Sequence, residues 1–235
     1  MILKQNKISS IAIICARGGS KGLKNKNLKL LNGTPLIGRV IEHAIQSNCL
    51  DSIIVSTDDE DIAQTAIKFG AEVPFIRPIG ISGDLATTEE TLQHALLKYE
   101  EVSGKFFDIA VFLTATDIFR KPEWIRMAVE KLISSPDLDS VFVGMKTHKN
   151  FWERQEDGTW IRLKEWMSNY SSRQVRRFIV REDTGLACAS RAELWREGKR
   201  IGDKVDIIVN DDDFTGIDIH HLEDLELAQA AIDIR

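Results

Sequence analysis

A glycine- and lysine-rich loop near the N-terminus is the segment of this chain best suited to hold a phosphate. It runs from Ala16 to Asn27, directly after an apolar stretch, and reads ARGGSKGLKNKN. Glycines let backbone N–H groups approach a phosphate closely, and Arg17, Lys21 and Lys26 supply positive charge. The loop lacks the GxxxxGKS/T pattern of P-loop NTPases and the GxGxxG pattern of dinucleotide-binding folds. It predicts a triphosphate site of another kind, although a basic turn without a ligand has the same composition.

A second group that could bind a substrate is a run of arginines in the C-terminal half. It is the one dense cationic stretch in a chain of formal net charge −5, and it comprises Arg173, Arg176, Arg177 and Arg181. A planar guanidinium group is well suited to a carboxylate, so the run predicts a site for an acidic substrate. The alternative is a solvated strand face whose charges pair with the nearby Glu182 and Asp183.

The elements that must position these groups alternate between strands and helices. Apolar stretches rich in β-branched residues predict strands at 11–16, 52–57, 73–76, 109–114, 140–143, 186–189, 205–209 and 216–219. Apolar residues at helical spacing predict helices at 36–45, 58–69, 88–99, 122–134 and 222–232. We therefore expect one α/β domain, residues 1–235, with a doubly wound, mostly parallel sheet. Ligands of such a sheet bind beyond the carboxyl ends of its strands, which is where the loop lies.

The alternation breaks between residues 145 and 179. Three tryptophans, Trp152, Trp160 and Trp166, lie there among charged residues, with a turn at Asp157-Gly158. Clustered aromatic side chains favour an inserted arm that packs on a partner subunit. An ordinary surface excursion is the alternative.

The composition excludes several classes of function. An acidic chain without a basic patch is not expected to bind nucleic acid. Three widely spaced cysteines without a CxxC pair indicate neither a disulfide framework nor a structural zinc site. No run of 18 apolar residues and no apolar N-terminal leader is present, so we expect a cytoplasmic protein without a membrane partner.

The loop also carries a specific likeness. RGGSKGLKNKN resembles the RGGSKGIPxKN loop of the CMP-sugar synthetases, the acylneuraminate cytidylyltransferases. Further similar segments follow in the same order over nearly the whole chain: VSTDDEDIA at 55–63, GAEVPFIRP at 70–78, SGDLATTEETLQHAL at 82–96, SSRQVRRF from 171, and IDIHHLEDLELA from 217. An ordered set of this kind is stronger than any one motif.

The resemblance implies a Rossmann-like nucleotidyltransferase fold with a protruding dimerisation arm, a homodimer, and transfer of CMP from CTP to an acidic nine-carbon sugar. It assigns catalysis to Arg17, Lys21 and Asp218. It assigns the nucleotide to Arg17, Gly18, Gly19, Ser20, Lys21, Lys26, Asn27, Arg77, Ala86, Thr88 and Thr114, the last standing where the family has glutamine. For Thr88, capping of the following helix is an equal alternative.

The acceptor side is less similar to the family. Arg173 and Gln174 match its RQ pair, and Lys146 lies near a substrate-side lysine, so these three residues are assigned to the sugar carboxylate. Sialic, legionaminic and pseudaminic-type acids are the expected acceptors. The alternatives are an eight-carbon 3-deoxy sugar acid as acceptor, and a nucleotide-binding module without turnover.

The magnesium site departs most from the family pattern. The family's DID motif places two carboxylates on one face of an extended segment, whereas this chain has Asp218-Ile219-His220. Magnesium prefers oxygen ligands, so we expect His220 to hold a bound water rather than the ion. The family's QPTSP segment is Thr114 to Ile118 here, and Asp117 in it adds a carboxylate. We therefore expect Mg²⁺ to be held by Asp218 and Asp117, with a turn or helix-cap role as the alternative for Asp117.

Overall fold

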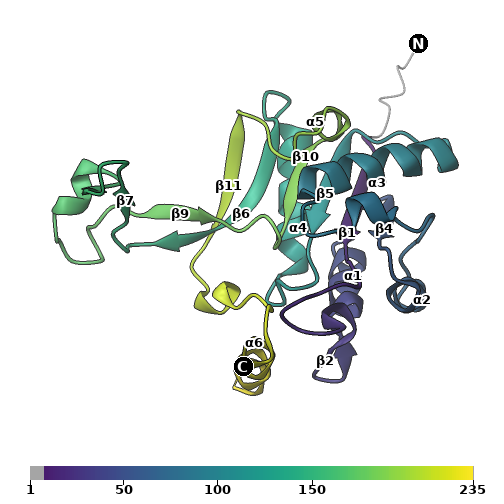
Figure 1. The fold of residues 1–235 in the computed structure, drawn as a ribbon. Helices are drawn as coiled ribbons and strands as arrows, with labels where there is room; N and C mark the ends of the chain where they lie inside the picture. The colour runs from purple at the N-terminus through teal and green to yellow at the C-terminus, as the bar shows by residue number, and fades with distance from the viewer. Residues whose placement is uncertain (1–7, 235) are drawn as a thin grey trace, which may run out of the picture.

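The computed structural model describes residues 8–234 and is built around a seven-stranded sheet (Figure 1). Its strands are β1 (Ser10–Cys15), β4 (Ser52–Ser56), β5 (Ile109–Leu113), β6 (Ser140–Thr147), β9 (Ile179–Glu182), β10 (Cys188–Arg191) and β11 (Val205–Asn210). The strand order is β11-β6-β10-β5-β1-β4, and β9 pairs with the far part of β6. β10 is antiparallel to both β5 and β6, and β9 is antiparallel to β6. The other five strands run in one direction, which confirms the mostly parallel sheet.

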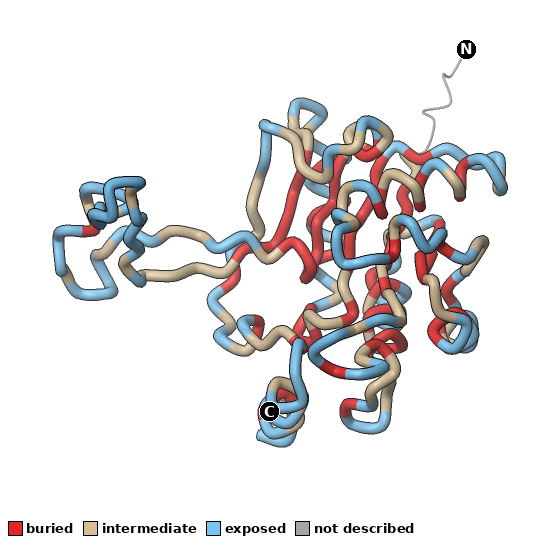
Figure 2. Tube along the Cα trace, viewed as in Figure 1, coloured by how far each residue is buried: buried red, intermediate tan, exposed pale blue. Residues whose placement is uncertain are grey.

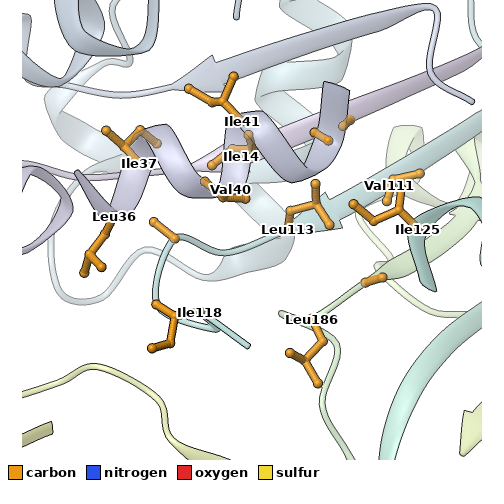
Figure 3. Packing of buried hydrophobic residues seen from close by; sticks show 14 of the residues in the cluster. Ile14, Leu36, Ile37, Val40, Ile41, Val111, Leu113, Ile118, Ile125 and Leu186 are labelled. Carbon is orange, nitrogen blue, oxygen red and sulfur yellow. The ribbon is translucent and has the colours of Figure 1, made fainter. Parts of the chain in front are cut away.

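Helices cover both faces of the sheet. They are α1 (Leu36–Gln46), α2 (Glu60–Lys68), α3 (Thr88–Ser103), α4 (Pro122–Ser134), α5 (Ala192–Arg196) and α6 (Leu222–Asp233). Alternate residues of β1 point to opposite faces. Ile14 packs with Ile37 and Ile41 of α1 on one face (Figure 3), whereas Ile13 packs with α3 and α5 on the other. Burial on both faces explains the continuous apolar strands that the sequence shows.

Two predicted strands are wrong. The stretch 73–76 lies beside β4 but forms only one isolated bridge, between Ile76 and Thr57, and the preceding Glu72 forms another with Ile54. In the stretch 216–219, Gly216 is the last residue of a short 3₁₀ helix, Asp213–Gly216, and residues 217–219 continue without sheet pairing. Both stretches are apolar because they pack against the domain, and burial without a neighbouring strand leaves the same sequence pattern. Ile219, for example, is fully buried.

Residues 147–178 leave the domain as a narrow arm. The paired ends of β6 and β9 form the base from which it extends, and its tip carries a two-stranded hairpin of β7 (Trp152–Arg154) and β8 (Trp160–Arg162). The arm projects away from the sheet (Figure 1), and most of its surface is exposed (Figure 2). Trp152 and Trp160 are 49% and 60% exposed, so their rings lie on the arm surface within this chain. A second small hairpin, β2 (Leu30–Leu31) with β3 (Thr34–Pro35), precedes α1.

The carboxyl ends of the three neighbouring strands β5, β1 and β4 lie at one edge of the sheet, since these strands are parallel. The loop from Ala16 to Asn27 leaves β1 there, Asp58 and Asp59 follow β4, and the stretch beginning at Thr114 follows β5. The backbone of Ile219 also reaches this edge, where its N–H donates to the Thr116 carbonyl at 3.3 Å. The expected ligand edge of the sheet is therefore built from four separate segments.

Candidate functional site

The glycine-rich loop forms one wall of a cavity of about 350 Å³ at this edge. The opposite wall comes from the end of β5 and from the turn before α6. The residues that line the cavity as a whole include Cys15, Arg17, Ser20, Lys21, Gly22, Lys26, Asn27, Thr114, Thr116, His220 and His221. We call it the loop cavity. It brings together most of the predicted phosphate-binding residues.

The glycines of the loop serve packing as well as ligand approach. A Cβ on Gly18 would collide with the Asp59 side chain, and one on Gly22 would lie 2.5 Å from the His220 carbonyl oxygen. A Cβ on Gly19, in contrast, would meet nothing within 4 Å, so its backbone is open to a ligand. The predicted reason, close approach of phosphate, therefore fits Gly19 best. Gly18 and Gly22 are required by contacts inside the protein.

A second cavity of about 270 Å³ adjoins the first, and Cys15 and Arg17 line both. Its other lining residues are Arg77, Ile81, Ser82, Gly83, Asp84, Ala86 and Thr91. We call it the side cavity. It contains two of the predicted nucleotide contacts, Arg77 and Ala86. Thr88 is not among its lining residues, and the cap of α3 is Thr87, which exchanges hydrogen bonds with Glu90.

Asp58 links the glycine-rich loop to Arg77, although its sequence context suggested only a helix start. Arg77 is 5% exposed and donates from Nε to Ser82 Oγ at 3.1 Å. Its Nη2 lies 3.7 Å from Asp58 Oδ1, the same oxygen that accepts a hydrogen bond from the Gly18 N–H at 3.0 Å. Asp58 therefore fixes the position of the glycine-rich loop relative to Arg77. Asp59, its neighbour, caps α2 by accepting from the Ile62 N–H.

The three cations of the loop have different environments. Lys26 is partly buried, and this desolvation lowers its pKa, while the opposite charge of Asp218 partly offsets the effect. Arg17 and Lys21 are more exposed and both pair with Asp84. Asn27 is buried and donates from Nδ2 to the Arg17 carbonyl at 3.0 Å, so it supports the loop from inside.

Arg120 organises the end of β5, and sequence reasoning missed it. Its guanidinium is buried and donates to the carbonyls of Thr114, Gly185 and Leu186. Burial lowers the pKa of Arg120 to about 10, and the charge of Asp117 opposes that shift. Asp117 accepts a hydrogen bond from Thr114 Oγ1. It is not the cap of α4, because that position is Lys121.

Asp117 and Asp218 are close enough for their charges to interact. Burial raises the pKa of Asp117 above its ordinary value, and the like charges of Asp218 and Asp183 add to the rise. Asp218 Oδ2 lies 2.9 Å from His220 Nε2, whereas its Oδ1 is buried without a hydrogen-bond partner. His220 and Asp218 therefore meet on one face of the segment, as the spacing predicts. Within residues 8–234, no three His, Cys, Asp or Glu side chains converge as a metal cage.

The predicted sugar-binding residues lie elsewhere in this chain. Lys146 and Arg173 line a cavity of about 960 Å³ at the base of the arm, together with Arg176, Arg181 and Asp211. None of its lining residues belongs to the loop cavity or the side cavity. Gln174 is exposed and is not part of the lining. A single chain thus brings two of the three residues together, but away from the glycine-rich loop.

The helices of the chain are all too short or too polar to be membrane spans, as far as the structure describes them.

Comparison with known proteins places the chain among cytidylyltransferases. The model of the cytidylyltransferase family matches residues 11–232. The chain is 44% identical over 120 residues to CMP-N,N'-diacetyllegionaminic acid synthase of Legionella pneumophila, with 51% of each protein covered. It is 40% identical over 147 residues to N-acylneuraminate cytidylyltransferase A of Danio rerio, covering 63% of this chain and 33% of that protein. The chain spans about half the length, or less, of these relatives.

Solved structures give the same fold at low identity. CMP:2-keto-3-deoxy-manno-octonic acid synthetase, complexed with CTP, superposes with a TM-score of 0.70 at 17% identity, covering 96% of this chain and 99% of that one. A 4-diphosphocytidyl-2C-methyl-D-erythritol synthase superposes with a TM-score of 0.67 at 12% identity, covering 97% and 99%. These likenesses confirm the predicted nucleotidyltransferase fold.

Proposed function

The chain belongs to the cytidylyltransferase family, and on that premise we propose that it transfers CMP from CTP to an acidic nine-carbon 2-keto sugar. The anomeric hydroxyl of the sugar attacks the α-phosphorus of CTP, and the bond to pyrophosphate breaks. Such a displacement requires positioning and charge neutralisation more than covalent chemistry by the protein. The chain offers cations and backbone N–H groups at the loop cavity for this purpose.

The pair of cavities that share Arg17 carries the proposal. The loop cavity is lined by Arg17, Lys21 and Lys26, which suit a triphosphate, and the side cavity is lined by Arg77 and Ala86, which suit the cytidine. A nucleotide bound across both would place its phosphates along the glycine-rich loop. Thr114, at the far wall, faces the same space and takes the place of the family's glutamine.

The acceptor is proposed to be a sialic, legionaminic or pseudaminic-type acid. Relatives named for each of these acids support this class, the last being pseudaminic acid cytidylyltransferase of Campylobacter jejuni, 34% identical over 128 residues. We assign the sugar carboxylate to Lys146, Arg173 and Gln174. The match to the eight-carbon enzyme, at 17% identity, concerns the fold alone.

We propose a homodimer in which the arm of one subunit completes the site of the other. Lys146 and Arg173 lie in a cavity that shares no residue with the loop cavity of their own chain. A second copy could bring its arm to that loop cavity, and the exposed rings of Trp152 and Trp160 would then gain a contact surface. We also propose that the enzyme acts in the cytoplasm, where CTP is made.

Mg²⁺ is the proposed cofactor, held by Asp218 and Asp117. The fit rests on two observations: Oδ1 of Asp218 is buried without a hydrogen-bond partner, and the pKa of Asp117 is raised. A dication would give that oxygen a partner and would stabilise the ionised form of Asp117. When bound, the ion would neutralise charge on the phosphates of CTP. His220 contacts Oδ2 of Asp218 and orients that carboxylate.

A nucleotide panel tests the proposal. Purified protein is given CTP, UTP, ATP or GTP, with Mg²⁺ and a mixture of nine-carbon acids, and pyrophosphate release is followed. We expect release that requires both CTP and an acid. Comparable release from UTP would contradict the cytidine assignment, and CTP binding without any release would favour the nucleotide-binding module.

A further inference from the structure

Asp84 pairs with two cations, Arg17 and Lys21, of the glycine-rich loop at residues 16–27, which is called the phosphate loop from here on. Its Oδ1 lies 3.0 Å from Arg17 Nη1, and its Oδ2 pairs with Lys21 Nζ. Lys21 makes the largest contribution to lowering the pKa of the Asp84 carboxyl, and Arg17 adds to it, so the group is ionised at neutral pH. Within residues 8–234, neither cation forms an ion pair with any other carboxylate. One carboxylate of the chain therefore offsets part of the positive charge that a phosphate would meet at these two cations.

The position of Asp84 makes competition with phosphate unavoidable. Asp84 lines the side cavity, while its carboxylate reaches the cations that line the loop cavity. A nucleotide that extends from Arg77 to Lys21 must pass its phosphates across this ion pair. Two anions then require the same two cations, and the carboxylate must give them up.

The segment around Asp84 can allow this exchange without disturbing the core. A Cβ on Gly83 would have nothing within 4 Å, and the Leu85 side chain is 96% exposed, so little packs against the segment. Ser82, in contrast, is buried and held by Arg77, so the wall of the side cavity stays in place. Exposed ion pairs contribute little to stability because water screens them, so a polyphosphate can replace them.

We propose that Asp84 is a positioning residue that stands in for phosphate: it pairs with Arg17 and Lys21 in the nucleotide-free protein, yields them to the triphosphate, and returns to them as pyrophosphate leaves. The inference rests on the proposed function, because it assigns pyrophosphate to the loop cavity. By offering the two cations an alternative partner, Asp84 weakens the hold on the product and speeds its release. No covalent bond to Asp84 forms at any stage.

Direct binding of pyrophosphate tests this without a sugar acceptor. Calorimetric titration of the wild type, Asp84→Asn and Asp84→Ala with pyrophosphate and Mg²⁺ gives the dissociation constants. Glu60→Gln is the matched control. Glu60 is an exposed carboxylate at the start of the neighbouring α2, and its substitution by Gln removes the same charge as Asp84→Asn. We expect both Asp84 variants to bind pyrophosphate about three- to tenfold more tightly than wild type, as the loss of two exposed competing ion pairs predicts. The control stays within about twofold of wild type.

The outcomes separate this inference from the proposed function. Equal affinity in the wild type and both Asp84 variants would overturn the inference alone, and so would weaker binding, which would mean that Asp84 preorganises the cations. Absence of pyrophosphate and CTP binding in every variant would overturn the proposed function and the inference with it. In turnover assays, a lower inhibition constant for pyrophosphate at unchanged melting temperature would support the exchange.

Discussion

The three lysines of the phosphate loop are chemically alike but differ in their surroundings. Lys26 is partly desolvated, and its charge interacts with that of Asp218. Lys24 is exposed and does not line the loop cavity. Lys21 is 78% exposed as a side chain and has only the exchangeable Asp84 as an ionic partner among the described residues. At the scale of single residues, Lys21 is therefore the group most available to a transferring phosphate.

The Lys21→Ala substitution should lower activity strongly without affecting the fold. Loss of one charge contact to the reacting phosphate costs about 2–4 kcal/mol of transition-state stabilisation, or roughly 30- to 1,000-fold in kcat/KM. Steady-state kinetics with CTP measures this, and Lys24→Ala in the same loop is the control. An unchanged kcat/KM for Lys21→Ala, with the wild-type melting temperature, would remove Lys21 from the catalytic residues.

The metal assignment predicts a change in magnesium requirement. Asp218→Asn and Asp117→Asn should each raise the Mg²⁺ concentration for half-maximal rate by at least about tenfold, because each removes a hard oxygen charge. His220→Asp should be tolerated, since an oxygen ligand would replace the imidazole beside Asp218. The rate is titrated with Mg²⁺ for all three variants.

Two results would change this assignment. If Asp117→Asn matches the wild type in its Mg²⁺ titration but melts at a lower temperature, Asp117 is a structural counterion of Arg120. That alternative follows from the opposing charge effect of Asp117 on the buried guanidinium. If Mn²⁺ or Zn²⁺ outperforms Mg²⁺ and His220→Asp reverses that preference, His220 is a direct ligand.

At the scale of elements, the arm and the loops at the sheet edge have different kinds of support. The loops after β5 and before β10 are joined by Arg120, which donates to carbonyls in both. The arm has only Met167 fully buried among its residues, so it lacks a core of its own. Because small appendages without a core are marginal alone, the arm should be stabilised by a partner surface.

We expect light scattering to give twice the chain mass of 26.5 kDa at assay concentrations. Trp160→Ser should weaken the dimer, because the exposed ring would lose its contact on the partner. Leu227→Ser is the control, since Leu227 is a similarly exposed apolar residue on α6. A fully active monomer would contradict the shared site.

Mixed dimers test whether the arm completes the partner's site. Lys21→Ala and Arg173→Ala chains are each expected to be weakly active, but a mixed dimer contains one site with neither change if sites are shared. Random mixing should then restore about one quarter of wild-type activity, from half the dimers with one intact site each. No recovery in exchanged mixtures would mean that each chain uses its own arm.

At the scale of the whole molecule, the sequence predicts the sheet and its ligand edge well. Apolar, β-branched runs identify β1, β4 and β5, and the polar segments that follow them meet as expected. The predicted strands at 73–76 and 216–219 were wrong because an apolar run reports burial, not the presence of a pairing strand. Only the fold brings a partner strand into place.

Three residues at the candidate site could not be predicted from the sequence, for a related reason. Asp58 contacts a residue 40 positions away in the sequence, and Arg120 contacts one 66 positions away. Asp84 contacts two loop cations, which are 67 and 63 positions away. Nothing in their local sequence distinguishes them from helix starts or surface charges. Arg77 and Ala86, which line the side cavity, could be proposed from the sequence because the resemblance supplied that long-range information.

The central claim, cytidylyl transfer to an acidic nine-carbon sugar, is tested most directly by identifying the product. The protein is incubated with CTP, Mg²⁺ and, separately, sialic, legionaminic, pseudaminic and eight-carbon 3-deoxy acids, and each mixture is analysed by mass spectrometry. We predict a CMP-linked conjugate of at least one nine-carbon acid, formed with an equal amount of pyrophosphate and much faster than any eight-carbon conjugate. A conjugate of the eight-carbon acid alone, or none with any acid while CTP binds, would contradict the account.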